Sequence, residues 1–356
     1  MKIYLKTYGC QANIADSEKI AGLIQQASHT LVNAENRAEL LIVNSCSVKN
    51  KTQSKILYYI EQQLKANKKV FVGGCLPKTI NLRKKFSGLT SIFDTNSISK
   101  IQDIIEKPKD VFSNKKENKL ALPLSRKDKN IGVITISEGC LTNCNFCATK
   151  LARGNLSSCR IGDIKRSVKK AINEGCTTIY LTSQDNGCYG FDIKTSLPEL
   201  LKELVSIPGN YKIRVGMLNP QYLKKILKPL IAAYNSEKIL KFLHIPVQSG
   251  SNKVLKEMSR GHSAEDFINA AKIFRKNFPN ITISTDIIIG YPTETGSDFQ
   301  ATIDLIKLTK PEVLNISKFS SRPRTRASRL KQLSSEIIKE RSKEIHELYK
   351  KYKKES

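Results

Sequence analysis

Three closely spaced cysteines constrain this chain more than any other feature. Cys140, Cys144 and Cys147 follow a C-x3-C-x2-C spacing, directly after the apolar run 132–136, which is typical of a buried strand. We therefore expect them on a loop at the carboxyl end of that strand. A structural zinc site needs a fourth ligand, and none of the four histidines is near them in the sequence. A four-iron cluster held by three cysteines instead keeps one iron open to a small molecule. Zinc, or chance spacing, is the alternative.

A second set of three cysteines precedes this loop. Cys10 follows the alternating run 2–8, Cys46 follows the apolar run 40–43, and Cys75 follows the run 70–72. Separations of 36 and 29 residues fit βαβ units of roughly 30 residues. Parallel strands end at one edge of a sheet, so the three cysteines are expected to converge beyond the carboxyl ends of the strands. Three ordinary buried cysteines are the alternative, but another three-thiolate set favours a second iron–sulfur cluster.

The order of apolar and amphipathic segments predicts an α/β fold. An N-terminal parallel-sheet α/β domain (1–93) is expected to contain helices at 16–26, with Asp16 or Ser17 as N-cap, and at 51–65. A basic linker (94–130) leads to six strand–helix units in 131–320, too few to close an eight-stranded barrel. We therefore predict an open partial (β/α)6 barrel. Its strands are expected at 133–136, 178–182, 212–217, 242–247, 282–289 and 313–317, and its helices at 161–173, 197–205, 221–234, 264–278 and 297–308.

Composition restricts the possible partners and compartments. Lys and Arg number 60 against 32 Asp and Glu, giving a net charge of +28 that favours a polyanion such as RNA. A lysine-rich proteome is the alternative explanation. Without an apolar run of membrane-spanning length or a signal-like leader, the sequence predicts a cytoplasmic protein with no membrane contact. Nine cysteines in that reducing compartment favour metal binding over disulfides.

Polar residues follow several of the predicted barrel strands, where a barrel of this kind places its active site. Their side chains are suited to accept hydrogen bonds from an ammonium group or a ribose hydroxyl, which makes them candidate cofactor contacts. Helix capping is the alternative role, especially near Ser251. His244 lies inside a strand pattern and is expected to be a core histidine. The candidate cofactor-binding residues are Gln184, Asp185, Gln248, Ser249 and Asp286.

The motifs GCLTNCNFCATKLARGNLSSCR, IYLTSQDNGCYG, LHIPVQSGS and DIIIGYPTET, together with the two cysteine sets, resemble the radical S-adenosylmethionine (SAM) methylthiotransferases. These enzymes replace a C–H bond by C–S–CH3. The segment 152–156 looks like the archaeal and eukaryotic branch, whose substrate is N6-threonylcarbamoyladenosine next to the tRNA anticodon. Relatives that act on isopentenyladenosine in tRNA, or on a ribosomal protein, share the cysteine sets and stay alternatives.

The resemblance implies two [4Fe–4S] clusters and SAM as cofactors. The cluster on Cys140, Cys144 and Cys147 would cleave SAM to a radical, and the cluster on Cys10, Cys46 and Cys75 would carry the sulfur. A radical route suits adenine carbon 2, because that position has no acidic proton. The implied partners are tRNA, a reductase or ferredoxin-type electron donor, and a sulfur donor, and we expect a monomer. Three further cysteines are expected to be dispensable: Cys159, Cys176 and Cys188.

The C-terminal segment departs from the family pattern. Relatives continue from arginine-proline-glycine-threonine-proline into a small RNA-binding module known as TRAM, which the sequence does not predict here. Residues 318–356 instead carry 13 basic and 5 acidic side chains, and 321–356 reads as a basic tail with a helix. The hypothesis is that this tail contacts tRNA phosphates; an amphipathic helix packed on the barrel is the alternative. The candidate RNA contacts are Arg153, Arg322, Arg324, Arg326 and Arg329.

Two other function classes compete with the enzyme. They are a non-catalytic iron–sulfur RNA-binding protein and an iron–sulfur electron carrier.

Overall fold

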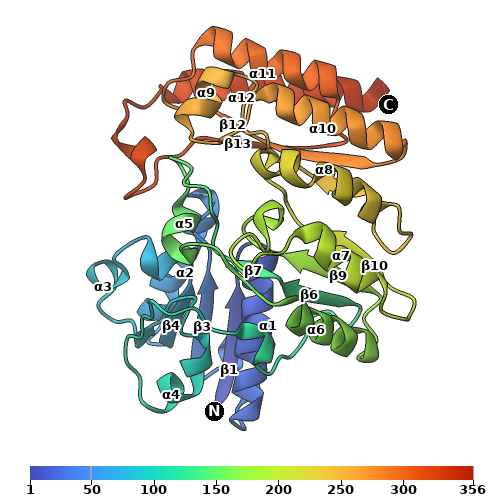
Figure 1. The fold of residues 1–356 in the computed structure, drawn as a ribbon. Coiled ribbons are helices and arrows are strands. Elements are labelled where there is room, and N and C mark those ends of the chain that lie inside the picture. The colour runs from blue at the N-terminus through green and yellow to red at the C-terminus, as the bar shows by residue number, and fades with distance from the viewer. Residues whose placement is uncertain (49, 356) are drawn as a thin grey trace. The chain divides into compact units, whose positions relative to one another are not determined.

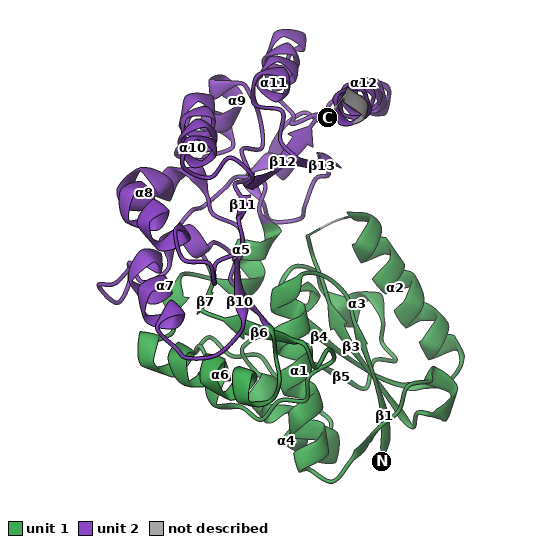
Figure 2. Cartoon of the chain, turned by 90° about the vertical axis from the view of Figure 1, so that its right-hand side faces the viewer, with its two compact units in different colours: residues 1–139, 148–177 green, residues 140–147, 178–356 purple. Residues whose placement is uncertain are grey.

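The computed structural model describes residues 1–48 and 50–355, and Figure 1 follows the chain along its length. The chain divides into two compact units, drawn in different colours in Figure 2. Unit 1 holds residues 1–139 and 148–177, and unit 2 holds residues 140–147 and those from 178 onward. Cys10, Cys46 and Cys75 therefore lie in unit 1, and Cys140, Cys144 and Cys147 lie in unit 2.

A five-stranded parallel sheet forms the centre of unit 1, in the order β2-β1-β3-β4-β5. The register pairs Thr7 with Asn44 and Asn44 with Gly73, so the carboxyl ends of the three longest strands lie level. This alignment is the one that the cysteine spacings predicted. The strands are β1 (Lys2–Thr7), β2 (Thr30–Leu31), β3 (Leu40–Ser45), β4 (Lys69–Gly74) and β5 (Ser91–Ile92).

Two apolar cores cover the two faces of this sheet. Every residue of β3 is buried, both the apolar run 40–43, as expected for a strand covered on both faces, and the polar residues Asn44 and Ser45 that follow it. Its residues alternate between the faces, because successive side chains of a strand point in opposite directions. Leu41 and Val43 pack with Ile56 of α2 (Asn50–Lys65), whereas Leu40 and Ile42 pack in the other core, which includes residues of α1 (Gln11–Gln26) and α4 (Ile101–Glu106). The sheet is thus buried on both sides.

Helix α1 begins earlier than predicted. The sequence placed its start at Asp16 or Ser17, but the helix runs from Gln11, with Cys10 as its N-cap residue. Asp16 and Ser17 lie inside the helix and are buried, at 2% and 7% exposure. The prediction was wrong because both residue types favour N-caps, while here they serve as buried hydrogen-bonding and ion-pairing groups. This early start brings the first turn of α1 next to the first cysteine.

The remainder of unit 1 includes the segment predicted as a basic linker. Residues 94–130 contain α4 and the buried Lys119, and Phe93 forms a parallel bridge with Val111, so this segment is part of the folded unit. A short antiparallel pair, β7 (Ser137–Glu138) with β8 (Ser157–Ser158), flanks the cysteine loop. The other elements are α3 (Leu82–Lys85), β6 (Ile131–Thr135), α5 (Ala148–Arg153) and α6 (Ile161–Asn173).

Unit 2 alternates strands and helices. β9 pairs in parallel with β10, and β11, β12 and β13 form a parallel sheet in that order. β9, β12, α6 and α7 have the bounds that the sequence predicted. The strands are β9 (Thr178–Thr182), β10 (Lys212–Val215), β11 (Phe242–His244), β12 (Thr282–Ile289) and β13 (Val313–Lys318). The helices are α7 (Leu197–Val205), α8 (Pro220–Tyr234), α9 (Asn252–Glu257), α10 (Ala264–Asn277), α11 (Gly296–Thr309) and α12 (Ser335–Glu355).

The C-terminal helix α12 packs on the strands of unit 2. Ile345 is fully buried, and Tyr352 donates a hydrogen bond of 2.7 Å from its hydroxyl to the carbonyl oxygen of Pro311. Arg341 pairs with Glu294 at 2.5 Å. Ile338 lies against Gly290, where an added Cβ would come within 2.5 Å of it. The packed amphipathic helix that the sequence left as an alternative is therefore present.

The repeated parallel units confirm the α/β class that the sequence predicted. Within residues 1–48 and 50–355, we find no helix with both the length and the apolar character needed to cross a membrane.

Candidate active site

Unit 1 brings Cys10, Cys46 and Cys75 together at the carboxyl edge of its sheet. Cys10 is exposed, while Cys46 and Cys75 are 4% and 3% exposed. Burial raises the pKa of the Cys75 thiol to about 11; Arg153 opposes this rise, and charge on Cys46 and Cys10 adds to it. The strand register sets these cysteines at the level ends of β1, β3 and β4, and Asn13 bonds to all three segments that carry them. The predicted convergence of this set is therefore present.

Asn13 connects the three cysteine-bearing segments. Its Nδ2 donates hydrogen bonds of 2.8 Å to the carbonyl oxygens of Tyr8 and Ser45, which precede Cys10 and Cys46. Its Oδ1 accepts a hydrogen bond of 3.8 Å from the Cys75 thiol. One amide side chain in the first turn of α1 thus fixes all three strand ends. The early start of this helix is what places Asn13 there.

The backbone at Gly9 allows this close packing. Gly9 has φ +113°, and an added Cβ would come within 2.8 Å of the Cβ of Cys46 and 3.1 Å of the Nδ2 of Asn13. Only glycine adopts such a φ readily and also leaves this space free. Gly9 therefore lets the loop of Cys10 approach that of Cys46.

Behind Asn13 lies a buried network of four charged side chains. Arg153 pairs with Asp16 at 2.6 Å and with Glu138 at 2.7 Å, and its Nη2 donates a 3.0 Å hydrogen bond to Oδ1 of Asn13. Lys119 pairs with the same two carboxylates, at 2.9 and 2.6 Å. Burial would raise the pKa of Glu138, but Lys119 and Arg153 outweigh it and lower that pKa to about 2. Glu138 is therefore held as an anion.

The position of Arg153 corrects its predicted role. The sequence marked it as an RNA contact, but its side chain is 2% exposed and bound to the partners above. A buried guanidinium in a closed network does not reach a phosphate. Of the arginines predicted near the C-terminus, Arg322 is also buried, at 6% exposure, whereas Arg324, Arg326 and Arg329 are exposed.

In unit 2, hydrogen bonds hold the loop of Cys140, Cys144 and Cys147. The backbone amide of Asn145 donates to the carbonyl oxygen of Met258 at 3.0 Å, and the hydroxyls of Thr142 and Tyr222 lie 2.9 Å apart. These contacts tie the cysteine loop to α8 and to the segment after α9. Protein contacts therefore help to fix the shape of this loop.

Arg260 lies next to this loop. It is 4% exposed and donates from Nη1 to the Sγ of Cys144 at 3.4 Å, and from Nη2 to the carbonyl oxygen of Pro246 at 2.8 Å. Burial raises the pKa of Cys144, and the Arg260 charge acts to lower it. A neighbouring cation of this kind favours the thiolate, which is the form that binds metals. Each cysteine set therefore has one buried arginine beside it.

Asp185 and Gln248 are the most constrained of the predicted cofactor contacts. Asp185 is 1% exposed; its Oδ1 accepts hydrogen bonds from the amides of Gly187 and Asn219 at 2.9 and 3.0 Å. Its Oδ2 is buried and, among the described residues, has no hydrogen-bond partner. Gln248 has φ +77°, a left-handed conformation that is costly for a side chain with a Cβ. Half of the Asp185 carboxylate thus serves as a cap, and the other half is buried without a hydrogen-bond donor among the described residues.

Ser249 and Asp286 are bound to neighbouring side chains, and Gln184 is half-buried. Ser249 accepts a 3.2 Å hydrogen bond from the amide of Ser251, and Ser251 is the N-cap residue of α9, so the capping role that the sequence left open belongs to Ser251. Asp286 accepts from Asn315 at 2.7 Å and lies 3.2 Å from Nε2 of His244. His244 is therefore a satisfied histidine, as predicted.

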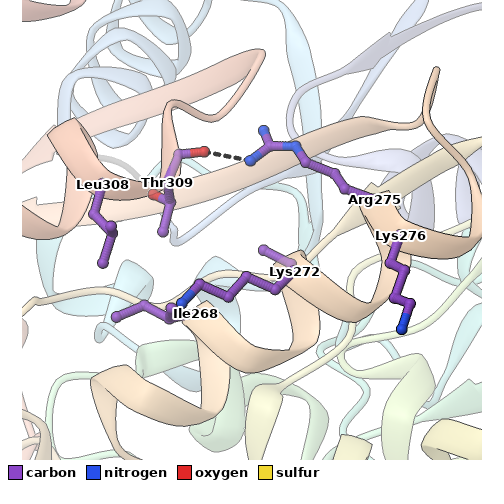
Figure 3. Close-up of a pocket in the computed structure, with 7 residues that line it drawn as sticks. Ile268, Lys272, Arg275, Lys276, Leu308 and Thr309 are labelled. Carbon is purple, nitrogen blue, oxygen red and sulfur yellow. Dashed lines mark hydrogen bonds between the residues drawn. The ribbon is translucent and has the colours of Figure 1, made fainter.

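A separate hollow of about 410 Å³ lies between α10 and α11 in unit 2, lined by Lys272, Arg275, Leu308 and Thr309 among others (Figure 3). Arg275 already donates to the backbone carbonyl oxygens of Thr309 and Lys310 and pairs with Glu312 at 2.8 Å. None of the lining residues belongs to a strand end or to a cysteine loop. We do not assign the active site to this hollow.

Known families match both parts of the chain. Residues 2–93 match a family described as Uncharacterized protein family UPF0004, and residues 134–306 match the Radical SAM superfamily. A Pyrococcus horikoshii protein named Probable threonylcarbamoyladenosine tRNA methylthiotransferase is 41% identical over 98% of this chain and 84% of its own length. The chain belongs to the threonylcarbamoyladenosine tRNA methylthiotransferase family. The human Threonylcarbamoyladenosine tRNA methylthiotransferase is 36% identical over 99% of this chain and 63% of its own length.

Solved structures of radical SAM enzymes share the fold of this methylthiotransferase-family chain. The methyltransferase TsrM from Kitasatospora setae aligns with a TM-score of 0.64 at 14% identity, over 92% of this chain and 75% of its own. The cobalamin-dependent enzyme OxsB aligns with a TM-score of 0.65 at 12% identity, over 92% of this chain and 60% of its own. At such low identity the likeness concerns the fold alone.

Sequence reasoning missed Asn13 and Arg260, and gave Arg153 a different role. Asn13 carried one usable sequence signal, its place three positions after Cys10. Its burial, at 1% exposure, is known only from the structure. Arg260 follows α9 and is separated by 116 residues from Cys144, so no local sequence pattern could predict their contact. Both residues act on the cysteine sets through tertiary contacts.

Proposed function

We propose that this family member is a radical SAM tRNA methylthiotransferase that converts N6-threonylcarbamoyladenosine next to the anticodon to its 2-methylthio derivative. The observation that carries this proposal is the presence, in one chain, of two separate three-cysteine sets, each beside a buried arginine. The relatives named for the same reaction support the choice of substrate.

The residues fit the cofactors that this reaction uses. Cys140, Cys144 and Cys147 would hold one four-iron cluster and Cys10, Cys46 and Cys75 a second, since thiolates are the usual ligands of such clusters. When bound, the clusters and SAM supply the electron, the radical chemistry, the sulfur and the methyl group. The chain itself supplies positioned cysteine side chains and neighbouring positive charge.

Cofactor contact is proposed for the strand-end residues of unit 2. The unpartnered Oδ2 of Asp185 suits a donor such as the ammonium or a ribose hydroxyl of SAM, because an unsatisfied buried carboxylate oxygen is costly. The left-handed backbone of Gln248 supports a functional site at the same edge. Gln184, Ser249 and Asp286 are kept as weaker candidates, because Ser249 and Asp286 already have partners.

Anaerobic reconstitution tests the two-cluster proposal. We expect about eight irons per chain, and formation of 5′-deoxyadenosine from SAM that depends on a reductant. Cys140→Ala should abolish SAM cleavage and leave about four irons, whereas Cys46→Ala should leave about four irons and intact SAM cleavage. A wild-type protein with only about four irons, all lost on Cys140→Ala, would contradict the second cluster.

Contact with tRNA phosphates is proposed for Arg324, Arg326 and Arg329, the exposed members of the predicted set. Replacing these three by glutamine should reduce the log–log salt slope of tRNA affinity by up to about 2.7, since each phosphate contact contributes roughly 0.9 or less. The matched control replaces three exposed lysines elsewhere: Lys51, Lys55 and Lys69. An equal change in slope for both triple variants would contradict a specific contact at the arginines.

An electron donor of the reductase or ferredoxin type and a separate sulfur donor are proposed as partners, because the reaction consumes electrons and sulfur that the chain does not generate. A monomeric state and a cytoplasmic location remain predictions. Isopentenyladenosine and a ribosomal protein remain the alternative substrates, and assaying them beside threonylcarbamoyladenosine distinguishes the three.

A further inference from the structure

Arg153 is the largest of the fully buried side chains in the described part of the chain, and it carries a permanent charge. It is the last residue of α5, the helix that begins directly after Cys147. Burying a guanidinium is costly unless it is paired and hydrogen-bonded, so a buried arginine needs a structural or functional reason. Two carboxylates, Asp16 and Glu138, pair with it.

Charge balance explains why a cation stands at position 153, because Lys119 alone would leave one negative charge of Asp16 and Glu138 uncompensated. It does not explain the direction in which the guanidinium points. Arg153 differs from Lys119 in one contact, the 3.0 Å hydrogen bond from its Nη2 to Oδ1 of Asn13. The same oxygen accepts from the Cys75 thiol at 3.8 Å. The positive charge is therefore directed from the network toward the cysteine set of unit 1.

We propose that Arg153 is a positioning residue for the site of Cys10, Cys46 and Cys75, and that its guanidinium offsets the negative charge of these thiolates and of the group they hold. This inference rests on the proposed function, in which that group is an iron–sulfur cluster. Asp16 and Glu138 fix the guanidinium, and Asn13 places it against the sulfur atoms. The sequence prediction of an RNA contact is replaced by this role inside unit 1.

The electrostatic surroundings agree with the contact geometry. Burial acts to lower the pKa of Arg153, but Asp16 raises it, and Cys75, Glu138 and Cys10 act in the same direction as Asp16. For Lys119, the groups that raise its pKa are Asp16 and Glu138. Asp16 and Glu138 thus raise the pKa of both cations of the network. Cys75 and Cys10 are further groups that raise the pKa of Arg153.

The charge of Arg153 should affect the reduction potential of a cluster held by Cys10, Cys46 and Cys75. Reduction adds negative charge to a cluster, so a nearby fixed cation stabilises the reduced form and raises the reduction potential. Removal of Arg153 should lower the potential and weaken retention of the cluster. Lysine at the same position keeps the charge, but its single ammonium group does not reproduce a planar fork that reaches Asp16, Glu138 and Asn13 together.

The test uses the full chain with Cys140→Ala, Cys144→Ala and Cys147→Ala as the parent, so that any cluster sits on the set of unit 1. The parent is reconstituted anaerobically, its iron is counted, and its reduction potential is titrated by electron paramagnetic resonance. Arg153→Gln, Arg153→Lys and Lys119→Gln are made in this parent. Lys119→Gln is the matched control, because it removes one positive charge from the same network without touching Asn13.

We expect Arg153→Gln to shift the potential to more negative values and to shorten the lifetime of the cluster against an iron chelator at least fivefold. Arg153→Lys should restore part of both properties, and it also tests the inference if Arg153→Gln does not fold. Lys119→Gln should lower thermal stability with a clearly smaller shift in potential, because a purely structural role would affect both variants alike.

The iron content of the parent and the potentials of its variants distinguish failure of the second cluster from failure of the role of Arg153. A parent that binds no iron would overturn the second cluster of the proposed function, and this inference with it. A parent with about four irons whose potential is unchanged by Arg153→Gln or Arg153→Lys would overturn the inference alone. Equal shifts for Arg153→Gln and Lys119→Gln would also overturn it, since the network charge and not its direction toward Asn13 would then be responsible.

Discussion

The Nη1 atom of Arg260 donates a hydrogen bond to the Sγ atom of Cys144 across 3.4 Å. Arg260 is 4% exposed and is also anchored to the carbonyl oxygen of Pro246. A fixed cation at this position stabilises the Cys144 thiolate, and it would stabilise added negative charge on a cluster held by the same loop. Unit 2 thus repeats the arrangement that Arg153 provides in unit 1.

Arg260→Gln should lower the reduction potential of the cluster on Cys140, Cys144 and Cys147. A hydrogen bond to a charged group contributes about 1.5 to 3 kcal/mol, which corresponds to about 60 to 130 mV for one electron. The measurement is a redox titration of protein in which Cys10, Cys46 and Cys75 are replaced by alanine. Arg275→Gln serves as control, because Arg275 lies at the hollow in Figure 3 and contacts backbone carbonyls and Glu312. An Arg260→Gln potential equal to that of the control would contradict the role of Arg260.

Asn13→Ala should destabilise unit 1 by about 2 to 4 kcal/mol, because the carbonyl oxygens of Tyr8 and Ser45 lose their buried donor. Chemical denaturation of the cluster-free protein measures this change in the free energy of unfolding. Gln102→Ala is a suitable control, since it removes a single 3.1 Å hydrogen bond to the carbonyl oxygen of Leu23. If both variants lose the same stability, Asn13 is not the link between the cysteine-bearing segments.

The stability of the protein should depend on pH through His262. Burial, followed by the charge of Arg260, lowers the pKa of His262 to about 4, below its ordinary value of 6.5. His262 therefore becomes protonated below about pH 6.5 in the unfolded chain, but only below about pH 4 in the folded chain. Stability is fully present above this window and declines as the pH falls, by about 3 kcal/mol in total.

Denaturation curves of the unaltered protein and of His262→Gln between pH 7 and pH 5 test this dependence by their difference. Glu138 loses its contribution only at lower pH, whereas Asp185, whose pKa burial raises to about 7, acts in the opposite direction in both proteins. His262→Gln keeps a side-chain donor for the carbonyl oxygen of Val247, which lies 3.3 Å from Nε2 of His262. The variant should be less stable at pH 7 and show a flatter pH dependence in this window. An unchanged slope would assign the acid sensitivity to other groups.

Cys140 and Cys188 should form a disulfide in the cluster-free protein under a mild oxidant such as diamide. The sulfur atoms of these two residues and a carboxylate oxygen of Asp185 all lie within 4.8 Å of one another. Peptide mass spectrometry after alkylation detects the cross-link, and Cys188→Ala should remove it. Bound cluster should protect Cys140. A cross-link from Cys140 to Cys144 or Cys147 instead would contradict the geometry of the loop.

The strands and helices were largely predictable, whereas the groups that tune the cysteines were not. β9 and β12 had clear apolar patterns between turn residues, and the amphipathic pattern of α6 gave both of its ends. The start of α1 was misplaced, because Asp16 and Ser17 favour capping positions but serve here inside a helix.

Interactions between distant parts of the chain explain the remaining errors. Lys119 pairs with Asp16 across 103 residues, and Arg153 bonds Asn13 across 140 residues, so neither partner is visible from a local pattern. A basic residue in a basic segment looks like a surface contact until its burial is known. The cysteine spacing, by contrast, encoded the level strand ends directly, because one βαβ unit has a characteristic length.

Mass spectrometry of tRNA nucleosides tests whether this protein methylthiolates N6-threonylcarbamoyladenosine in tRNA. The reconstituted protein is incubated with SAM, a reductant, sulfide and tRNA that carries N6-threonylcarbamoyladenosine, with Cys46→Ala and Cys140→Ala as matched controls. We expect the 2-methylthio derivative of this nucleoside with the unaltered protein and with neither variant. Unmodified threonylcarbamoyladenosine, despite a full iron content and active SAM cleavage, would contradict it.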